Sequence, residues 1–245
     1  MFNIWKKGKD ERFDYSLLQT DMHSHLVPGI DDGAPDMDVA VQLVKGLSEL
    51  GYKKLITTPH VMWDMYKNTS EIVLNGYEIL RQKLKDENIN VQIGVAAEYF
   101  LDNYVKNLLA NKEPLLTIKD NLVLVEFSMA SEPIDLKEIL FEMQLQGYQP
   151  VIAHPERYSY YERNLEFFSI MKSSGYLFQL NILSLAGLYG KSARTLALHF
   201  IKNNYYELAG TDLHNPLHLR ALSDPSISVE LKRLIDSGTL RNLDL

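Results

Sequence analysis

Histidine and carboxylate side chains recur where predicted strands end. Five of the seven histidines follow such strands, namely His23, His25, His60, His154 and His214. Four carboxylates also lie at the ends of predicted strands, namely Asp21, Glu98, Glu126 and Asp212. Imidazoles and carboxylates without a thiolate form a donor set suited to a multi-metal site of Mn, Fe or Zn. Because the carboxyl ends of parallel strands meet on one face, we expect these groups to converge there.

The spacing of these residues supports a shared site. His23 and His25 are two residues apart, so on a strand both side chains point to the same face. Asp212 and His214 repeat this spacing. Any one histidine or glutamate at a strand end more often caps or salt-bridges than binds a metal. Nine such residues together would form a costly cluster of charges without cations, so the set as a whole indicates metal binding.

Composition narrows the possible chemistry. The 245 residues include no cysteine, which excludes disulfides, thiolate zinc sites and phosphatases with a cysteine nucleophile. The 25 basic and 32 acidic side chains give a net charge of −7. The basic residues are dispersed rather than gathered in a stripe, so no nucleic-acid partner is expected. Bound divalent cations would offset part of the negative charge.

Strand-length apolar segments alternate with helix-length amphipathic segments. Strands are expected at residues 17–22, 54–58, 91–97, 122–127, 150–153, 177–180 and 206–209. Helices are expected at residues 36–50, 70–86, 136–146, 164–173, 192–203 and near 228–236. Gly51, Gly147 and Gly175 follow three of these helices, where a left-handed residue commonly ends the helix. The alternation predicts an α/β fold, either a barrel or a doubly wound sheet.

Several common motifs are absent from the sequence. There is no GxGxxG or GxxxxGK[ST] nucleotide loop and no GxSxG nucleophile elbow. Apolar runs reach only a few residues, so no transmembrane segment is expected. Residues 1–10 contain three lysines but no following hydrophobic stretch, which argues against a secretory signal. The expected location is the cytoplasm.

Six motifs in order resemble the polymerase and histidinol phosphatase (PHP) superfamily. They are DMHSHLVPGIDDG (21–33), TTPH (57–60), GVAAEYFLD (94–102), VLVEFS (123–128), VIAHPERY (151–158) and GTDLHN (210–215). More narrowly, they are similar to bacterial metal-dependent protein-tyrosine phosphatases encoded with capsule and exopolysaccharide genes. The resemblance spans about residues 20–215. It implies a distorted (β/α)7 TIM-like barrel, and we expect residues 1–245 to form one domain.

The resemblance also implies three divalent cations. The first would be bound by His23, His25, Glu98 and Asp212. The second would be bound by Glu98, Glu126 and His154, so that Glu98 bridges the two. The third would be bound by Asp32, His60 and His214. Carboxylates at Asp32 and Glu126 favour Mn²⁺, with Fe, Zn or Mg as alternatives.

Two aspartates near these motifs need separate assignment. Asp31 is an alternative to Asp32 in the third site, and the spacing from His23 favours Asp32. Asp21 resembles a residue that orients a ligand histidine, with a strand-end salt bridge as the alternative.

The implied reaction is hydrolysis of a phosphomonoester. Two cations bridged by Glu98 can hold a shared hydroxide and direct it in line at phosphorus. Arg157 is expected to bind and stabilise the transferring phosphoryl group, the alternative being an ion pair with Glu156 or Glu162. Arg220, the nearest arginine after the last motif, is a second candidate for substrate binding.

Other polar and aromatic residues receive structural assignments. His199 falls within a predicted helix, and His218 is expected at the surface rather than at the entrance of the site. Tyr158, Tyr160 and Tyr161 are expected to pack within their loop, although they could stack on a substrate ring.

The expected substrate is protein phosphotyrosine, with a capsule-assembly tyrosine kinase as the natural target. A tyrosine leaving group, with a pKa of about 10, needs less protonation than an alkoxide. One alternative is a small phosphomonoester such as histidinol phosphate. Another is a metal-stabilised binding module without catalysis, which is disfavoured because every expected ligand position is filled.

Overall fold

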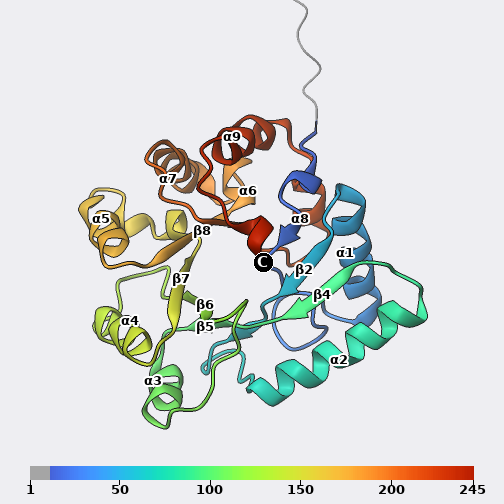
Figure 1. The fold of residues 1–245 in the computed structure, drawn as a ribbon, viewed down its shortest axis with the longest axis horizontal. Helices are drawn as coiled ribbons and strands as arrows, with labels where there is room; N and C mark the ends of the chain where they lie inside the picture. Colours follow the sequence, from blue (N-terminus) through green and yellow to red (C-terminus); the bar gives the residue numbers. More distant parts are fainter. Residues whose placement is uncertain (1–11) are drawn as a thin grey trace, which may run out of the picture.

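Parallel strands surrounded by helices form the centre of the molecule (Figure 1). The computed structural model describes residues 12–245. The expectation of no secretory signal at residues 1–10 lies outside the described residues. Among residues 12–245, no helix combines the length and apolar character needed to span a bilayer.

Within residues 12–245, the strands form two sheets, and every neighbouring pair in them is parallel. The three-stranded sheet has the order β1-β2-β4, and the six-stranded sheet has the order β3-β5-β6-β7-β8-β9. The strands are β1 (Thr20–Asp21), β2 (Lys54–Thr57), β3 (His60–Val61), β4 (Gln92–Val95), β5 (Glu98–Phe100), β6 (Leu122–Glu126), β7 (Gln149–Ala153), β8 (Leu177–Asn181) and β9 (Leu208–Gly210).

Two of the predicted strands are bent, so each contributes to both sheets. After β2 the chain continues through Thr58 and Pro59 into β3, and after β4 it continues through Ala96 and Ala97 into β5. β2 pairs with β4, whereas β3 pairs with β5. The prediction that Glu98 closes a single strand is therefore wrong, because Glu98 begins β5.

The last strand returns to the first and closes the barrel. The backbone N–H of Asp212 donates to His23 O at 2.8 Å, and that of His25 donates to Leu213 O at 2.9 Å. Ser24 and Leu213 form a parallel bridge. With each bent strand counted once, seven strands surround the axis, which confirms the distorted (β/α)7 barrel.

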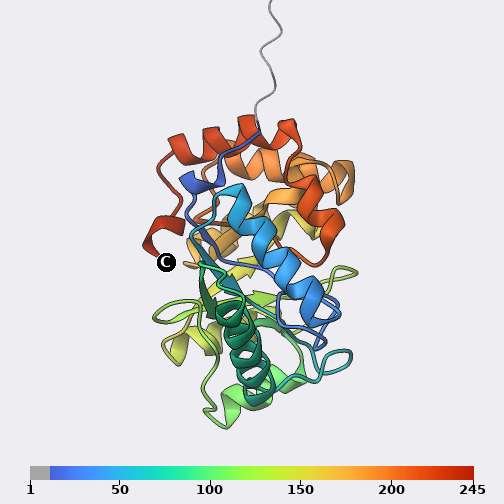
Figure 2. The ribbon, with the colours of Figure 1, turned by 90° about the vertical axis from the view of Figure 1, so that its right-hand side faces the viewer.

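The helices cover the outside of the barrel. They are α1 (Met37–Leu50), α2 (Ser70–Asp86), α3 (Asn103–Ala110), α4 (Leu136–Leu145), α5 (Glu166–Ser173), α6 (Ile182–Leu185), α7 (Gly190–Lys202), α8 (Pro216–Ala221) and α9 (Pro225–Asp236). The 3-10 turns in the described part of the chain are η1 (Tyr15–Leu17), η2 (Pro155–Arg157), η3 (Ser159–Tyr161) and η4 (Asn242–Asp244). Figure 2 shows α1 and α2 along the same side of the barrel, where they contact each other. The six predicted helices are present, and α3, α6 and α8 were not predicted.

Local sequence explains how α1 forms. The Asp36 side chain accepts a hydrogen bond from Val39 N at 2.9 Å and caps the first turn. Leu43 and Leu47 lie on the buried face, where each side chain contributes roughly 1.5–3 kcal/mol. Gly51 ends the helix with φ +117°, a conformation that disfavours residues with a Cβ atom.

The N-terminal segment differs from its prediction. Residues expected to begin a strand at position 17 instead form η1, because the Asp14 side chain accepts from Ser16 N and turns the chain. Tyr15 is buried and donates its hydroxyl to Leu222 O at 2.7 Å. The first strand therefore begins only at Thr20.

The C-terminal segment covers the end of the barrel where the strands begin. Asn242 donates to Thr20 O and Ala209 O, at the start of β1 and within β9. Leu245 packs against a buried cluster that includes Met22 and Leu208. Figure 1 places the C-terminus at the centre of the ring of strands. Access to the barrel is therefore from the opposite end, where the strands finish.

Candidate metal centre

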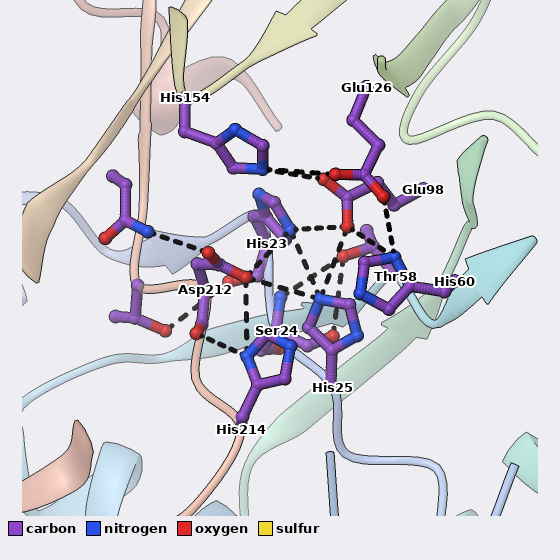
Figure 3. A network of polar contacts seen from close by, with 12 residues as sticks. His23, Ser24, His25, Thr58, His60, Glu98, Glu126, His154, Asp212 and His214 are labelled. Carbon is purple, nitrogen blue, oxygen red and sulfur yellow. Dashed lines mark hydrogen bonds and ion pairs between the residues drawn. The ribbon is translucent and has the colours of Figure 1, made fainter. Parts of the chain in front are cut away.

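The predicted metal ligands converge at the end of the barrel where the strands finish, and Figure 3 labels all of them except Asp32. They come from segments that are far apart in the sequence but adjacent around the barrel. Their atoms fall into three overlapping groups. Group one is His23, His25, Glu98 and Asp212; group two is Glu98, Glu126, His154 and one nitrogen of His60; group three is Asp32, His214 and the other nitrogen of His60.

In group one, four donor atoms face a common point. Nε2 of His23 lies 3.3 Å from both Glu98 Oε2 and Asp212 Oδ1. Nε2 of His25 lies 3.5 Å and 3.4 Å from the same two oxygens. The two Nε2 atoms are 3.3 Å apart. All four side chains are buried, so these donors are shielded from bulk water.

In group two, Glu98 and Glu126 lie between two histidines. Nε2 of His154 is 3.1 Å from Glu98 Oε1 and 3.8 Å from Glu126 Oε2. Nδ1 of His60 is 3.1 Å from both Glu98 Oε2 and Glu126 Oε1. The sequence interpretation included His154 here but missed His60, because a motif does not indicate which ring nitrogen faces which partner.

Group three is more open to solvent. Asp32 Oδ1 lies 3.4 Å from His60 Nε2 and 3.5 Å from His214 Nε2. The Asp32 side chain is 53% exposed. Asp31 is instead directed inward, where its Oδ2 lies 2.8 Å from His25 Nδ1 and accepts from His60 N at 3.0 Å. The geometry therefore favours Asp32 for the third group and gives Asp31 the role of orienting His25.

The donor set fits divalent cations. Among the described residues, the buried atoms without a hydrogen-bond partner include His60 Nδ1, Glu98 Oε2 and His154 Nδ1. Of these three atoms, His60 Nδ1 and Glu98 Oε2 face other donors of groups one and two. Buried polar atoms are rarely left without partners, and nitrogen and oxygen donors within 4.8 Å of one another suit Mn, Fe or Zn. The described residues thus provide a cluster of donors able to bind metal ions.

Without cations, the clustered charges shift several pKa values. Burial lowers the pKa of His23, but the Glu98 and Asp212 carboxylates outweigh this and raise it to about 9. Burial raises the pKa of Glu98, but His23 and His60 hold it well below its ordinary value. Protons on the imidazoles thus compensate the carboxylates when no cation is present.

Two of the candidate ligands have a strained backbone. His154 has φ 33° and Asp212 has φ 51°, both in the left-handed region that is uncommon for residues other than glycine. Such strain persists only where surrounding contacts hold it, and it is concentrated at functional sites. At His154 the carbonyl accepts from Arg157 N at 2.9 Å, which forms η2 and brings Arg157 back to the site.

Arg157 lies beside group one. Its Nη1 donates to Asp212 Oδ2 at 2.9 Å, and its guanidinium carbon is 4.3 Å from the centroid of the Tyr189 ring. The alternative pairing with Glu156 or Glu162 is not observed. Glu156 accepts from Ser184 and Tyr206 hydroxyls, and Glu162 accepts from Ser192.

A pocket of about 550 Å³ opens over groups two and three. Its polar lining includes His60, Glu126, His154, Arg157 and His214. Its apolar lining includes Met62, Met65, Tyr66, Phe100, Phe127 and Met129. The Arg157 guanidinium and the apolar wall together can accept a phosphate ester that carries an aromatic group.

Several assignments near the pocket need correction. Arg220 is exposed on α8 and is not among the residues that line the pocket. His218, expected at the surface, lines the pocket and has its Nδ1 3.3 Å from Asp212 O. His218 and Arg220 are two residues apart, about half a helical turn, so their side chains point to nearly opposite sides of α8. The registers of short helices such as α8 are difficult to predict from sequence.

Asp21 also differs from its predicted role. Its carboxylate accepts from Thr211 N at 2.8 Å and Thr211 Oγ1 at 2.7 Å. It does not orient His23, whose Nδ1 is instead 3.0 Å from Gln179 Oε1. Asp21 thus joins the first strand to the last.

The tyrosines after Arg157 pack as expected. Tyr158 is buried and stacks on Phe127 with ring centroids 3.8 Å apart. Tyr160 donates its hydroxyl to Ser128 O at 2.9 Å, and Tyr161 stacks on Phe167. All three tyrosine side chains therefore pack against neighbouring residues, as the sequence predicted.

Comparison with solved structures supports this view of the fold and the site. A chain from the crystal structures of YwqE from Bacillus subtilis and CpsB from Streptococcus pneumoniae, described as unique metal-dependent tyrosine phosphatases, aligns with TM-score 0.77 and 27% identity. The alignment covers 89% of this chain and 86% of that chain. The lactonase Lmo2620 from Listeria monocytogenes shares the fold, with TM-score 0.54 and 12% identity over 92% and 89% of the two chains. The barrel and its clustered donors define a metal-dependent hydrolase.

The sequence comparisons identify the family. The family described as capsular polysaccharide synthesis, CpsB/CapC, matches residues 19–229, and the chain belongs to it. Tyrosine-protein phosphatase YwqE of Bacillus subtilis (strain 168) is 30% identical over 196 residues, covering 80% of this chain and 77% of the relative. Putative tyrosine-protein phosphatase CapC of Staphylococcus aureus is 27% identical over 195 residues, covering 80% and 76%. The resemblance inferred from the six motifs is confirmed.

Proposed function

We propose that this protein is a metal-dependent phosphatase that hydrolyses phosphotyrosine on a protein substrate. One observation carries the proposal: a cluster of histidines and carboxylates lies beside an apolar-walled pocket that Arg157 also lines, and Asp212 of group one pairs with the Arg157 guanidinium. The relatives named as tyrosine-protein phosphatases cover most of the chain and support the same activity. A tyrosine kinase of capsule or exopolysaccharide assembly is the proposed natural substrate.

Each group of donors is proposed to hold one divalent cation, with Mn²⁺ as the favoured ion. Group one would hold the first cation, group two the second and group three the third, and Glu98 would contribute to two of them. Bound divalent cations lower the pKa of a water molecule and neutralise phosphate oxygens. No covalent intermediate on the protein is then needed.

The residues of the chain would position the substrate around these cations. Arg157 would bind the phosphoryl oxygens, because its guanidinium lies at the pocket and is held by Asp212 and Tyr189. A guanidinium can donate two parallel hydrogen bonds to a phosphoryl group and stabilise its developing charge. The apolar wall with Met65 and Met129 would exclude water from the tyrosine ring.

Location and organisation follow from this proposal. Phosphotyrosine is made with ATP, so we place the enzyme with its kinase in the cytoplasm. One barrel supplies all the donor groups, and we propose that the chain acts as a single domain.

The experiment that tests the proposal compares two substrates. Purified protein is assayed for phosphate release from a phosphotyrosine peptide and from histidinol phosphate, before chelation, after chelation and after addition of Mn²⁺. The variant His23→Ala serves as the control for group one. Peptide hydrolysis that chelation abolishes, Mn²⁺ restores and the variant lacks is expected. Hydrolysis of histidinol phosphate alone would favour the alternative substrate, and activity insensitive to chelation would rule out the metal mechanism.

A further inference from the structure

A buried amide on β8 contacts two of the candidate ligand residues. Gln179 is completely buried in the barrel. Its Oε1 lies 3.0 Å from the Nδ1 atom of His23 and accepts from the backbone N–H of His154 at 3.2 Å. Its Nε2 donates to Leu180 O at 2.5 Å. Gln179 therefore joins the segment that follows β1 to the residue that follows β7.

The two backbone contacts determine which way the amide points. A backbone N–H can only donate and a backbone C=O can only accept, so the atom facing His154 N is the oxygen and the atom facing Leu180 O is the nitrogen. The ring nitrogen of His23 that faces the same oxygen must then carry a proton. This leaves Nε2 of His23 as the atom that faces Glu98 and Asp212.

The contact with Gln179 also helps to hold the backbone of His154. His154 has the left-handed φ of 33°, and such a residue needs contacts that hold it. The hydrogen bond to Gln179 fixes its N–H, and Arg157 N fixes its carbonyl. Gly210 leaves space for this arrangement, because a Cβ atom there would lie 2.6 Å from His23 Cβ and 3.1 Å from Gln179 Nε2.

We propose that Gln179 is a positioning residue for the metal centre: it fixes the Nδ1-protonated tautomer of His23 and holds the strained backbone of His154. It thereby sets one candidate ligand in group one and one in group two. A hydrogen bond to the distal nitrogen of a ligand histidine orients the ring, and losing it typically weakens metal binding about 10- to 100-fold. The inference rests on the proposed cation sites.

The test measures Mn²⁺ affinity directly, by titration against a competing chelator dye. Gln179→Met keeps the side-chain length but removes the acceptor, and should weaken the affinity by about 10- to 100-fold. Gln179→Glu keeps the acceptor oxygen for His23 and His154 but loses the donor to Leu180 O, so it should retain more affinity than Gln179→Met. In zinc-loaded, ¹⁵N-histidine-labelled protein, NMR should detect the Nδ1–H of His23 in the unchanged protein and in Gln179→Glu.

Asn242→Leu provides the matched control. Asn242 is also a buried amide with three backbone hydrogen bonds, but it lies at the opposite end of the barrel. The Asn242→Leu substitution should lower the melting temperature of the chelated protein without changing its Mn²⁺ affinity. If Gln179→Met does not fold, Gln179→Asn, which is too short to reach both partners, takes its place.

The outcomes separate this inference from the proposed function. Unchanged affinity in Gln179→Met would overturn the inference, as would equal losses in Gln179→Met and Gln179→Glu. If the unchanged protein does not bind Mn²⁺, the proposed cation sites themselves fail. If it binds Mn²⁺ but releases no phosphate, the proposed function fails while the role of Gln179 can still be measured.

Discussion

Asp212 connects the metal centre to Arg157 through its two carboxylate oxygens. Oδ1 faces His23 and His25 at 3.3 Å and 3.4 Å, whereas Oδ2 accepts from Arg157 Nη1 at 2.9 Å and from Asn181 Nδ2 at 2.7 Å. The guanidinium is therefore fixed beside group one before any substrate binds. This arrangement reduces the reorganisation needed when negative charge develops on a phosphoryl group.

Replacing Arg157 tests this arrangement. Arg157→Ala should lower kcat for a phosphotyrosine peptide by about 10²- to 10³-fold, as expected for loss of a donor to developing charge. Arg157→Lys should recover only part of this activity, because a lysine cannot donate in the same forked geometry. Arg220→Ala should have little effect, since Arg220 is exposed and away from the pocket lining. Steady-state kinetics of the three variants would check this, and a large loss in Arg220→Ala alone would reverse the two assignments.

The stability of the chelated protein should fall as pH rises. Despite burial, neighbouring carboxylates raise the pKa of His23 to about 9, and the pKa values of His60 and His214 are also raised. The folded state then binds protons more tightly than the unfolded state, so this stabilisation is complete below pH of about 6.5 and is lost towards pH 9. Melting temperatures measured with chelator at pH 6.5 and pH 9 should show the decrease.

With Mn²⁺ bound, the stability of the protein should no longer fall as pH rises. Cations compete with protons for the same nitrogens, so Mn²⁺ affinity should increase with pH over the same interval. Titration calorimetry in buffers with different ionisation enthalpies would measure the protons released. A chelated protein equally stable at both pH values, with no proton release on binding, would contradict this description of the charges.

Glu98 should control the occupancy of two sites. Glu98→Gln keeps the shape of the side chain but removes the charge shared by groups one and two, so we expect up to two bound cations to be lost. Elemental analysis after dialysis would measure the number per chain. Glu156→Gln is the matched control, because Glu156 is equally buried but bonds to Ser184 and Tyr206. Equal cation numbers in both variants would argue against a bridging role.

Asp31 and Asp32 should respond differently to substitution. Asp32→Ala should remove the third cation and leave the melting temperature of the chelated protein nearly unchanged, since its side chain is half exposed. Asp31→Ala should destabilise the chelated protein by about 1–3 kcal/mol, because it leaves His60 N and Gly33 N without their acceptor. Denaturant unfolding and metal analysis would measure both effects. The reverse pattern would make Asp31 the ligand.

Replacing an apolar residue of the pocket wall should weaken substrate binding. Met65 lines the pocket and is 64% exposed, so Met65→Ser should leave the fold intact. It should raise KM for a phosphotyrosine peptide with little change in kcat, because the lost contact is present in both ground and transition states. Ile79→Ser, an exposed apolar position on α2, is the control. Equal KM values for the two variants would indicate that the ring binds elsewhere.

The sequence alternation predicted repeated βα units, and the resemblance of the six motifs selected the barrel over a doubly wound sheet. Strand–helix alternation and the closing glycines specify repeated βα units, and strand-end positions of His23, His154 and Asp212 place them on one face. These features depend on local periodicity and on the common direction of parallel strands. They do not require knowledge of individual contacts.

Features that depend on bends and short elements were not predictable in the same way. The breaks between β2 and β3 and between β4 and β5 move Glu98 from the end of one strand to the start of another. α8 has only six residues, so no periodic pattern sets which side chain faces the pocket, and His218 rather than Arg220 lies there. Both depend on packing against the rest of the barrel.

The sequence by itself determined the chemistry of the site: the types of donor, the absence of thiols and the order of the motifs. Only the tertiary structure decided how these donors are oriented. Asp31 turns inward to His25 while Asp32 faces His60 and His214, although the two aspartates are adjacent in the chain. Gln179 reaches His23 across 156 positions of sequence. Such contacts arise from barrel closure, which brings distant strands within hydrogen-bonding distance, and local sequence patterns carry no record of them.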